Sequence, residues 1–340
     1  MMSEKKRVKG EALLEIKGLK IEGNSDGVWH PIVKGVDLTL KRGEVLGLIG
    51  ESGAGKSTMG LAAMGYARPG CRISGGSIVF DGIDLVGASD AQRRDLWGSR
   101  IAYVAQSASA AFNPAHRLID QTVETAVNHG VMSRDKAEAD ARDLYKRLQL
   151  PKPDTIGDRY PHQVSGGQLQ RAMTAMAMSC RPDLIIFDEP TTALDVTTQV
   201  EVLAAMRDIV EQFNTAAIYI THDLAVVAQM AHRIMVLRYG NEVEQAPTRD
   251  MLREPTKDYT KTLWAVRKIA KPEDISEDIV LRVHDVDASY GGGHKVLDHV
   301  TVQLPRGRTV AVVGESGSGR VAHGRAARRP GRKHPHRHSH

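Results

Sequence analysis

The first part of the chain carries the hydropathy pattern of strands. Leu14-Glu15-Ile16 and the stretch 36–40 alternate between apolar and polar residues, which is typical of strands with one buried face. Mainly apolar runs follow at 44–49, 101–105, 184–187 and 217–220. Short runs of this kind, bounded by turn residues, predict further strands that are largely buried. We therefore predict an α/β fold that opens with a β-rich region at about 12–40.

A helical pattern interrupts these strands. Between about 117 and 149, apolar residues such as Leu118, Val123 and Val127 recur with helical spacing, and a charged amphipathic helix is predicted from Arg134 to Leu148. Strands resume only at 184. We interpret residues of about 107–180 as a helical subdomain inserted into the α/β fold.

The stretch 50–57 lies between a predicted strand and a predicted helix, and it has the pattern Gly-x4-Gly-Lys-Ser. This is a phosphate-binding loop, in which backbone N–H groups converge on an anion and glycines let the backbone approach it. Lys56 is expected to reach the β- and γ-phosphates of a nucleoside triphosphate, and Ser57 to offer its hydroxyl to Mg²⁺. The predicted nucleotide-binding residues of this region are Gly50, Glu51, Ser52, Gly53, Ala54, Gly55, Lys56, Ser57 and Thr58.

Two adjacent carboxylates, Asp188 and Glu189, follow the apolar strand at 184–187. The carboxyl ends of parallel strands are where α/β sheets bind ligands, and neighbouring side chains of a strand point to different faces. Asp188 is expected to join the Mg²⁺ shell. Glu189 is expected to be a general base that activates water for attack on the γ-phosphate. The structural alternative for such a pair is a solvated turn.

Three further positions are candidates that also have structural alternatives. His222 follows the strand at 217–220 and could orient the attacking water or cap the strand end. The segment Ser165-Gly166-Gly167-Gln168 opens a helix and could form a second anion-binding nest, or Ser165 could be an ordinary N-cap. Trp29, between two strands of the β-rich region, could stack on an adenine ring or pack on the sheet.

Composition narrows the class of protein. A length of 340 residues with 41% hydrophobic residues suits one large or two ordinary globular domains. We find no apolar run of about 18 residues and no signal peptide, and the two cysteines form no motif, which suits a reducing cytoplasm. The net charge of +5 is local, because residues 320–340 contain six Arg, one Lys and no acid; subtracting these seven charges leaves −2 for the rest. The body is therefore not basic as a nucleic-acid-binding domain would be.

Together these motifs resemble the nucleotide-binding cassette of ABC transporters. The family's motifs match as follows: Walker A at 50–57, the glutamine loop at Gln106, the signature at 164–168, Walker B at 184–189, the D-loop at 193–195 and the switch histidine at His222. They occur in the family's order, and the resemblance covers roughly 12–268. It implies a P-loop NTPase with a mixed core sheet, an N-terminal antiparallel β subdomain and the inserted helical subdomain. The complete nucleotide-binding domain is accordingly predicted at 1–268.

The resemblance also implies ligands and partners. ATP would lie between the Walker motifs of one cassette and Ser165, Gly166, Gly167 and Gln168 of another, with Asp195 of the D-loop nearby. Mg²⁺ would be held by Ser57, Gln106 and Asp188, and the catalytic residues would be Glu189 and His222. The expected partners are a second cassette, which is another copy or a paralogue, and two integral membrane permease subunits. A substrate-binding protein would act indirectly, and no nucleic acid is expected.

Within the family, three segments are similar to the ATP-binding subunits of peptide/nickel importers, which include oligopeptide, dipeptide and glutathione systems. These segments are Phe-Asn-Pro at 112–114, Tyr-Pro-His-Gln at 160–163 and Pro-Thr-Lys-Asp-Tyr-Thr at 255–260. The similarity implies an ATPase that energises import of peptides or similar small solutes at the cytoplasmic face of the inner membrane. Two features depart from this group. Ser107-Ala108 replaces the usual acidic residue and proline, and residues 260–280 contain no cysteine, so we predict no iron–sulfur cluster.

Residues 280–319 repeat the start of the first cassette. Val300 corresponds to Val36, 306–307 to 42–43 and 314–317 to 50–53, and Tyr290 falls where an adenine-stacking residue would lie. We therefore predict a linker at 269–279 and an incomplete second cassette at 280–319. The repeat breaks at Arg320, where a lysine is expected. We hypothesise a reading-frame change at or just before this residue.

The tail at 320–340 is rich in Arg and His and is predicted to be disordered. A nucleic-acid-binding arm and a His-rich metal-binding tract are alternative interpretations of it. Two alternatives to import also stand for the whole chain. One is a soluble tandem-cassette ATPase that acts on ribosomes or DNA, and the other is a truncated product that does not serve a transporter.

Overall fold

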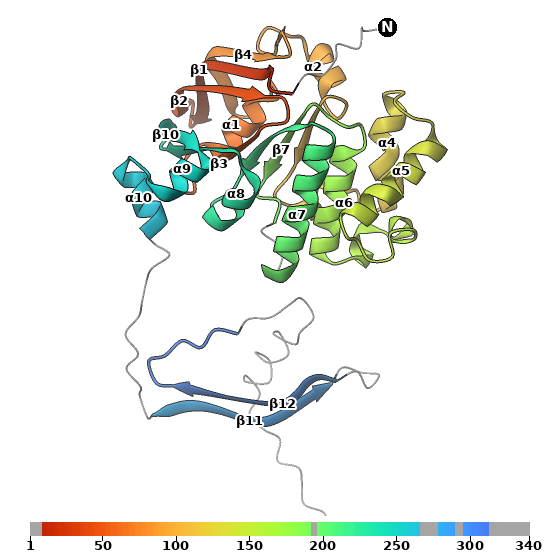
Figure 1. Cartoon of the computed structure of the whole chain (residues 1–340), viewed down its shortest axis with the longest axis vertical. Helices are drawn as coiled ribbons and strands as arrows, with labels where there is room; N and C mark the ends of the chain where they lie inside the picture. The colour runs from red at the N-terminus through yellow and green to blue at the C-terminus, as the bar shows by residue number, and fades with distance from the viewer. Residues whose placement is uncertain (1–8, 192–195, 266–277, 290–294, 313–340) are drawn as a thin grey trace, which may run out of the picture. The chain divides into compact units, whose positions relative to one another are not determined.

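The computed structural model describes residues 9–191, 196–265, 278–289 and 295–312. The chain divides into two compact units, one with residues 1–194 and 199–267 and the other with 195–198 and 268–340. Figure 1 shows both units, with labels on many of their elements. The first unit holds the α/β fold, and the second holds a hairpin of two strands.

A six-stranded sheet with the strand order β10-β9-β3-β8-β7-β6 forms the centre of the first unit. Its strands are β3 (Val45–Ile49), β6 (Ile101–Val104), β7 (Leu184–Asp188), β8 (Ala216–Ile220), β9 (Arg233–Arg238) and β10 (Asn241–Pro247). The strand β10 pairs antiparallel with β9, and the other neighbours in the sheet are parallel. Every residue of β3, β7 and β8 is buried, as their apolar runs predict.

A second sheet, antiparallel and with the order β2-β1-β4-β5, contains the β-rich start of the chain. Its strands are β1 (Ala12–Ser25), β2 (Val28–Lys41), β4 (Cys71–Phe80) and β5 (Ile83–Asp84). One buried cluster joins this sheet, through residues such as Leu14, to helix α1 (Lys56–Ala62) and to core-sheet residues such as Leu46. The helix that follows the phosphate loop is thus fixed by both sheets.

The chain between β6 and β7 is mainly helical. It contains α3 (Ala108–Ala111), α4 (Leu118–Asn128), α5 (Arg134–Arg147) and α6 (Gly166–Met178). Tyr145 of α5 is fully buried and shares a hydrogen bond of 2.6 Å with Thr122 of α4. The other helices of the first unit are α2 (Asp90–Leu96), α7 (Val196–Gln212), α8 (Leu224–Met230), α9 (Thr248–Arg253) and α10 (Asp258–Ala265).

A charged network ties the turn after β2 to the core sheet. Arg42 donates to Asp183 at 3.0 Å and to Asp81 at 2.7 Å, and Arg100 donates to the second oxygen of each carboxylate, at 2.7 Å and 2.6 Å. Arg42 and Asp183 are both buried. Because each buried charge has partners of opposite sign, the network orients the two sheets without leaving an uncompensated ion.

The hairpin of the second unit consists of β11 (Ile279–Ser289) and β12 (Lys295–Pro305). Its pairing repeats that of β1 and β2: Leu281–Leu304 corresponds to Leu14–Leu40, Val283–Val302 to Ile16–Leu38, and Val286–Val300 to Leu19–Val36. The register shifts after Ile16 in β1 and after the corresponding Val283 in β11. The two hairpins therefore share both register and bulge.

Two hydrogen bonds extend this correspondence. The N–H of Gly18 donates to the Asp37 carboxylate at 2.6 Å, and the N–H of Asp285 donates to the Thr301 hydroxyl at 3.0 Å. The N–H of Arg42 donates to the carbonyl of Glu11, directly before β1, at 2.8 Å, and the N–H of Arg306 donates to the carbonyl of Asp278, directly before β11, at 2.7 Å. These hydrogen bonds are formed by corresponding residues of the two hairpins, so the two repeats also share their backbone hydrogen bonding at the bulge and at the turn.

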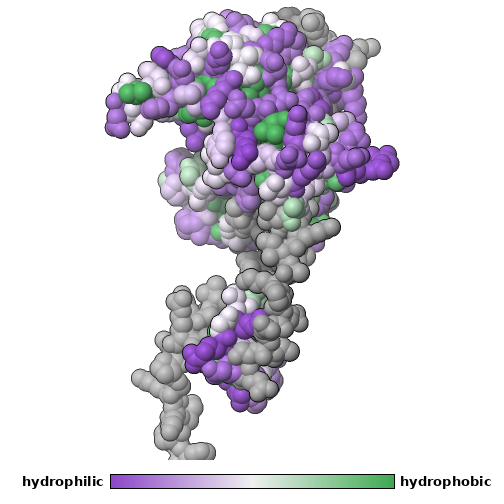
Figure 2. All heavy atoms as spheres, turned by 90° about the vertical axis from the view of Figure 1, so that its left-hand side faces the viewer, coloured by the Kyte–Doolittle hydropathy of each residue, from purple (hydrophilic) through white to green (hydrophobic). Residues whose placement is uncertain are grey.

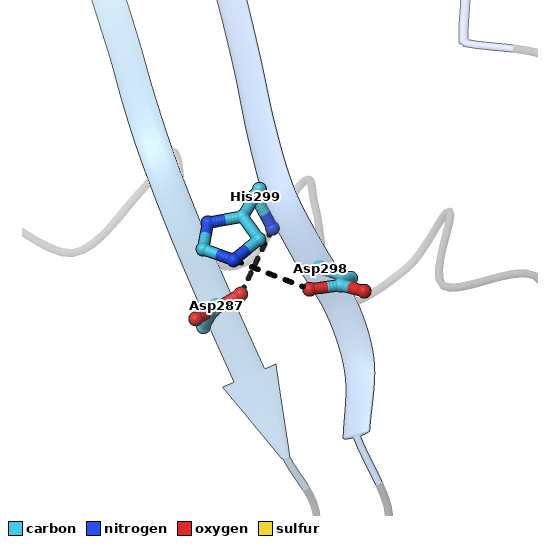
Figure 3. A group of neighbouring side chains, drawn as sticks. All are labelled: Asp287, Asp298 and His299. Carbon is cyan, nitrogen blue, oxygen red and sulfur yellow. Dashed lines mark hydrogen bonds and ion pairs between the residues drawn. The ribbon is translucent and has the colours of Figure 1, made fainter.

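An exposed group of Asp287, Asp298 and His299 lies across β11 and β12 (Figure 3). The ammonium of Lys295 lies 3.0 Å from Asp287 and also contacts Asp298. The hydrogen bond that the His299 ring forms to the Asp285 carboxylate, together with the charge of Asp287, raises the pKa of His299. Cationic side chains therefore already balance these carboxylates, and the group is an ion-paired cluster on the surface of the hairpin.

On the face of the molecule shown in Figure 2, hydrophobic residues are scattered among hydrophilic ones. Large apolar side chains instead fill three buried clusters of the first unit. Among the described residues, no helix combines the length and hydropathy that crossing a membrane requires.

Candidate functional site

The predicted phosphate loop joins β3 to α1. Gly50 has a φ of 151°, and a Cβ at this position would lie 2.2 Å from the carbonyl oxygen of Leu237. Gly55 precedes the helix with a φ of 98°, in the left-handed region that favours glycine. Both glycines are therefore required by the backbone of the loop.

Lys56 is folded back over this loop. Its Nζ donates to the carbonyl oxygens of Gly50 at 2.8 Å and Glu51 at 2.9 Å. Burial lowers the pKa of Lys56, although the charges of Glu189 and Asp188 act in the opposite direction. The ammonium is thus a poorly hydrated cation at the start of α1, where it can exchange carbonyl contacts for phosphate oxygens.

Asp188, the last residue of β7, is buried beside the phosphate loop. One carboxylate oxygen accepts a hydrogen bond from the Ser57 hydroxyl at 2.9 Å, and the other accepts one from the Tyr103 hydroxyl at 2.6 Å. Burial and the bond to Asp188 raise the pKa of Tyr103, so its phenol stays protonated and donates. Hydroxyl and carboxylate oxygens are the ligands that Mg²⁺ prefers, so this pair fits the predicted metal site.

Glu189 directs its carboxylate to a different set of partners. One oxygen accepts a hydrogen bond from the Gln106 amide at 3.1 Å, and the other lies 2.9 Å from Nδ1 of His222. The backbone of Glu189 has a φ of 50°, and its N–H donates to the carbonyl of Ile220 at 2.9 Å. The left-handed backbone after β7 separates the directions of the two adjacent acids, a conformation that is often found at active sites.

The loop residues, Gln106, Glu189 and His222 border one cavity of about 650 Å³, a size typical of small-ligand sites. Its lining residues are Ile32, Ser52, Gly53, Gly55, Lys56, Ser57, Thr58, Gln106, Glu189 and His222. Apart from Ile32, each of these residues is a site residue that the sequence analysis proposes. Asp188 and Tyr103 line a second cavity, which shares Ser57 and Gln106 with the first. Segments that lie far apart in the sequence therefore meet at the carboxyl ends of β3, β6, β7 and β8.

The signature segment does not line this cavity. Ser165 is the N-cap of α6, where its hydroxyl accepts from the N–H of Gln168 at 3.3 Å and the Gln168 side chain accepts from the N–H of Ser165 at 3.2 Å. Ser165 and Gly166 are exposed, and the space beside Gly166 is open. Within one chain the segment therefore has the capping role that we considered as its structural alternative.

Trp29 and Asp195 are two further residues that the sequence analysis proposes for the site. The ring of Trp29 lies in β2 under the guanidinium of Arg72, at 4.1 Å from the ring centroid, and it does not line the cavity. Ile32, on the same strand, lines the cavity instead. The adenine-stacking role of Trp29 therefore stays a prediction. Asp195 of the D-loop lies outside the described residues, as do Tyr290 and Arg320.

Tyr103 is a site residue that the sequence analysis does not identify. It lies on β6, paired in register with Ile186 of β7. Its position in a strand beside the Asp188-Glu189 strand, three residues before Gln106, is a signal that could have identified it. A lone tyrosine in a short apolar run gives no indication by itself that its hydroxyl reaches a carboxylate.

The fold and this arrangement define a P-loop nucleotide-binding domain with the groups for phosphate hydrolysis. A family model described as ABC transporter matches residues 33–192. A probable peptide ABC transporter ATP-binding protein of Sinorhizobium fredii is 38% identical over 75% of this chain and 76% of that protein. The glutathione import ATP-binding protein of Salmonella choleraesuis is 33% identical over 92% of this chain, but this chain spans only 58% of its length.

The fold comparison agrees with these sequence matches. The dimeric structure of the ABC transporter cassette MJ0796 is similar with a TM-score of 0.63 at 24% identity, over 69% of this chain and 99% of that one. The chain belongs to the ATP-binding proteins of the ABC transporter family, whose cassettes bind and hydrolyse ATP to power transport.

Proposed function

We propose that this chain is the ATPase subunit of an importer of peptides or similar small solutes. The carboxylate of Glu189, held between Gln106 and His222 beside the phosphate loop, supports hydrolysis at this site. The names of the two relatives refer to peptide transport and glutathione import, which favours import over a soluble ATPase that acts on ribosomes or DNA.

The chemistry follows from the positions of the side chains. ATP is the substrate, and its phosphates would take the place of the loop carbonyls as partners of Lys56. Glu189 would accept a proton from the water that attacks the γ-phosphate. His222 contacts the other oxygen of the same carboxylate, so it would keep the base oriented toward that water.

Ser57, Gln106 and Asp188 would hold Mg²⁺, whose positive charge would offset the charge of the phosphates. Ser57 and Asp188 already touch, and Gln106 borders the same cavity with its amide nitrogen bonded to Glu189. The carbonyl oxygen of Gln106 is the atom that this arrangement leaves to a metal ion.

The nucleotide site is proposed to be completed by a second cassette. Ser165 and Gly166 are exposed at the start of α6, where another cassette can reach them. Together with Gly167, Gln168 and a D-loop aspartate they would cover the ATP from the opposite side. Such a pair would work with two integral membrane permease subunits and, through them, a substrate-binding protein, at the cytoplasmic face of the inner membrane.

We further propose that 1–268 forms one cassette and that 280–319 is the start of a second, joined by the segment 269–279. The shared register and bulge of the two hairpins support this division. The strand β11 begins at Ile279, the last residue of the proposed linker. The match to 92% of this chain in the glutathione import protein is consistent with a relationship that extends past the first cassette.

Glu189→Gln tests the catalytic assignment. The amide cannot accept the proton, so we expect ATP turnover to fall by at least about 100-fold, while ATP binding changes little. Turnover is measured by phosphate release and binding by calorimetry. Glu201→Gln on the exposed side of α7 is the matched control and should behave like the wild type. Unchanged turnover in Glu189→Gln would contradict the role of Glu189.

A further inference from the structure

The segment Pro255–Thr260 has no part in the mechanism described above, yet it reaches the phosphate loop. It leads into α10, and the hydroxyl of Tyr259 accepts a hydrogen bond from the backbone N–H of Glu51 at 3.3 Å. Glu51 is the second residue of the loop, and 208 positions separate the two residues. The C-terminal helix of the cassette thus holds an N–H group directly before the phosphate-binding turn.

Packing fixes the ring of Tyr259 from more than one side. The guanidinium of Arg238 lies over the ring, 4.4 Å from its centroid. Tyr259 also packs, with Leu263 and Trp264, against a buried cluster that contains Ile49, the last residue of β3. Burial raises the pKa of Tyr259, although its bond to the Glu51 N–H acts in the opposite direction. The hydroxyl therefore stays neutral and fixed at the entrance to the loop.

The start of α10 is fixed independently by Glu244 of β10. Its carboxylate accepts from the N–H of Thr256 at 2.7 Å, from the Thr256 hydroxyl at 2.8 Å and from the N–H of Lys257 at 3.1 Å. Burial opposes ionisation of Glu244, but these bonds outweigh it and lower the pKa. A carboxylate that caps N–H groups before a helix holds that end in place.

We propose that Tyr259 is a positioning residue for nucleotide binding. Glu244 fixes the start of the helix, and the apolar cluster that contains Ile49 seats the ring of Tyr259. The Tyr259 hydroxyl then holds the Glu51 amide so that the loop is preorganised for phosphate. The inference depends on the proposed ATP site at 50–57. It gives the segment Pro-Thr-Lys-Asp-Tyr-Thr a function in the cassette of this chain that is separate from the catalytic groups.

Tyr259→Phe removes only the hydroxyl and tests the proposal in the full-length chain. Calorimetric titration with Mg·ATP should show binding that is about 3- to 10-fold weaker, the range for loss of one hydrogen bond. Tyr239→Phe is the matched control, because its ring lies at 5.1 Å from the same Arg238 but is 64% exposed. This control should bind Mg·ATP like the wild type.

Hydrogen exchange of the nucleotide-free protein separates positioning from general stability. In Tyr259→Phe the segment 49–55 should exchange faster, while the segment 258–265 keeps its wild-type protection. Faster exchange of both segments would overturn the proposal, because the hydroxyl would then support the helix and not the loop. Wild-type affinity in Tyr259→Phe would also overturn it. A wild-type chain that binds no Mg·ATP would instead contradict the proposed ATP site itself.

Discussion

The hairpins β1–β2 and β11–β12 have the same register and the same bulge, but their surroundings differ. In the first unit β1 also pairs with β4, and Leu14 lies in a cluster shared with α1 and the core sheet. In the second unit the corresponding Leu281 is only half-buried. Local sequence therefore sets how two strands pair, whereas burial of their apolar face depends on the rest of a cassette.

The turn that ends each hairpin shows the same difference. Arg42 is buried between Asp81 and Asp183, whereas the corresponding Arg306 forms an exposed ion pair with Asp278. An ion pair in water contributes little to stability, but loss of one partner from a buried network leaves charges without compensation. Equivalent residues in the two hairpins should therefore respond very differently to substitution.

The largest contrast is expected for the leucines. Leu14→Ala should lower the free energy of unfolding of the first unit by about 3–4 kcal/mol, because it leaves a cavity in a packed core. Leu281→Ala should change the free energy of unfolding of the second unit by less than about 0.5 kcal/mol, as is usual away from a core. Urea unfolding followed by circular dichroism measures both. Similar losses would mean that the second hairpin is packed as tightly as the first.

A smaller contrast is expected at the two turns. Arg42→Ala should destabilise the first unit by about 2–3 kcal/mol, since Asp81 and Asp183 then share Arg100 alone as their partner in this network. Arg306→Ala should be neutral within about 0.5 kcal/mol. The measurement is the midpoint of urea unfolding at constant slope. If Arg42→Ala proved neutral, the network would not contribute to joining the two sheets.

The smallest effect concerns the bulge. Gly18 has a φ of 58°, and the corresponding Asp285 has a φ of 51°, so a side chain is tolerated in this conformation in the second hairpin. Gly18→Asn should therefore cost less than about 1 kcal/mol, because asparagine enters the left-handed region readily. Gly18→Val, with a branched side chain, should cost about 1–2 kcal/mol. Equal effects in thermal unfolding would show that the bulge does not keep its conformation.

Much of the first unit was predictable because its signals are local. The apolar runs predict β3, β7 and β8, and the helical spacing predicts α4 and α5. The loop region accounts for six of the ten cavity residues, and the motifs at Gln106, Glu189 and His222 account for three more. The pair β9–β10 was not predicted, although residues 234–237 of β9 form an apolar run.

Contacts between side chains that are far apart in the sequence could not be predicted, because only folding brings these side chains together. The hydroxyl of Tyr103 bonds to Asp188, 85 positions away, and the hydroxyl of Tyr259 bonds to the Glu51 amide, 208 positions away. Neither tyrosine lies in a sequence motif from which its partner could be predicted. For Ser165 the sequence allowed both a cap and a nest. Within one chain Ser165 is the cap, and the proposed nest would form only against a second cassette.

The central claim is that the phosphate loop of the first unit, and not its repeat, binds the nucleotide. Calorimetric titration of the full chain with Mg·ATP tests it most directly, in the wild type and in Lys56→Ala. We expect one site per chain in the wild type and loss of at least about 100-fold in affinity in Lys56→Ala, which lacks the cation that faces the phosphates. A full-affinity site that remains in Lys56→Ala would contradict this account.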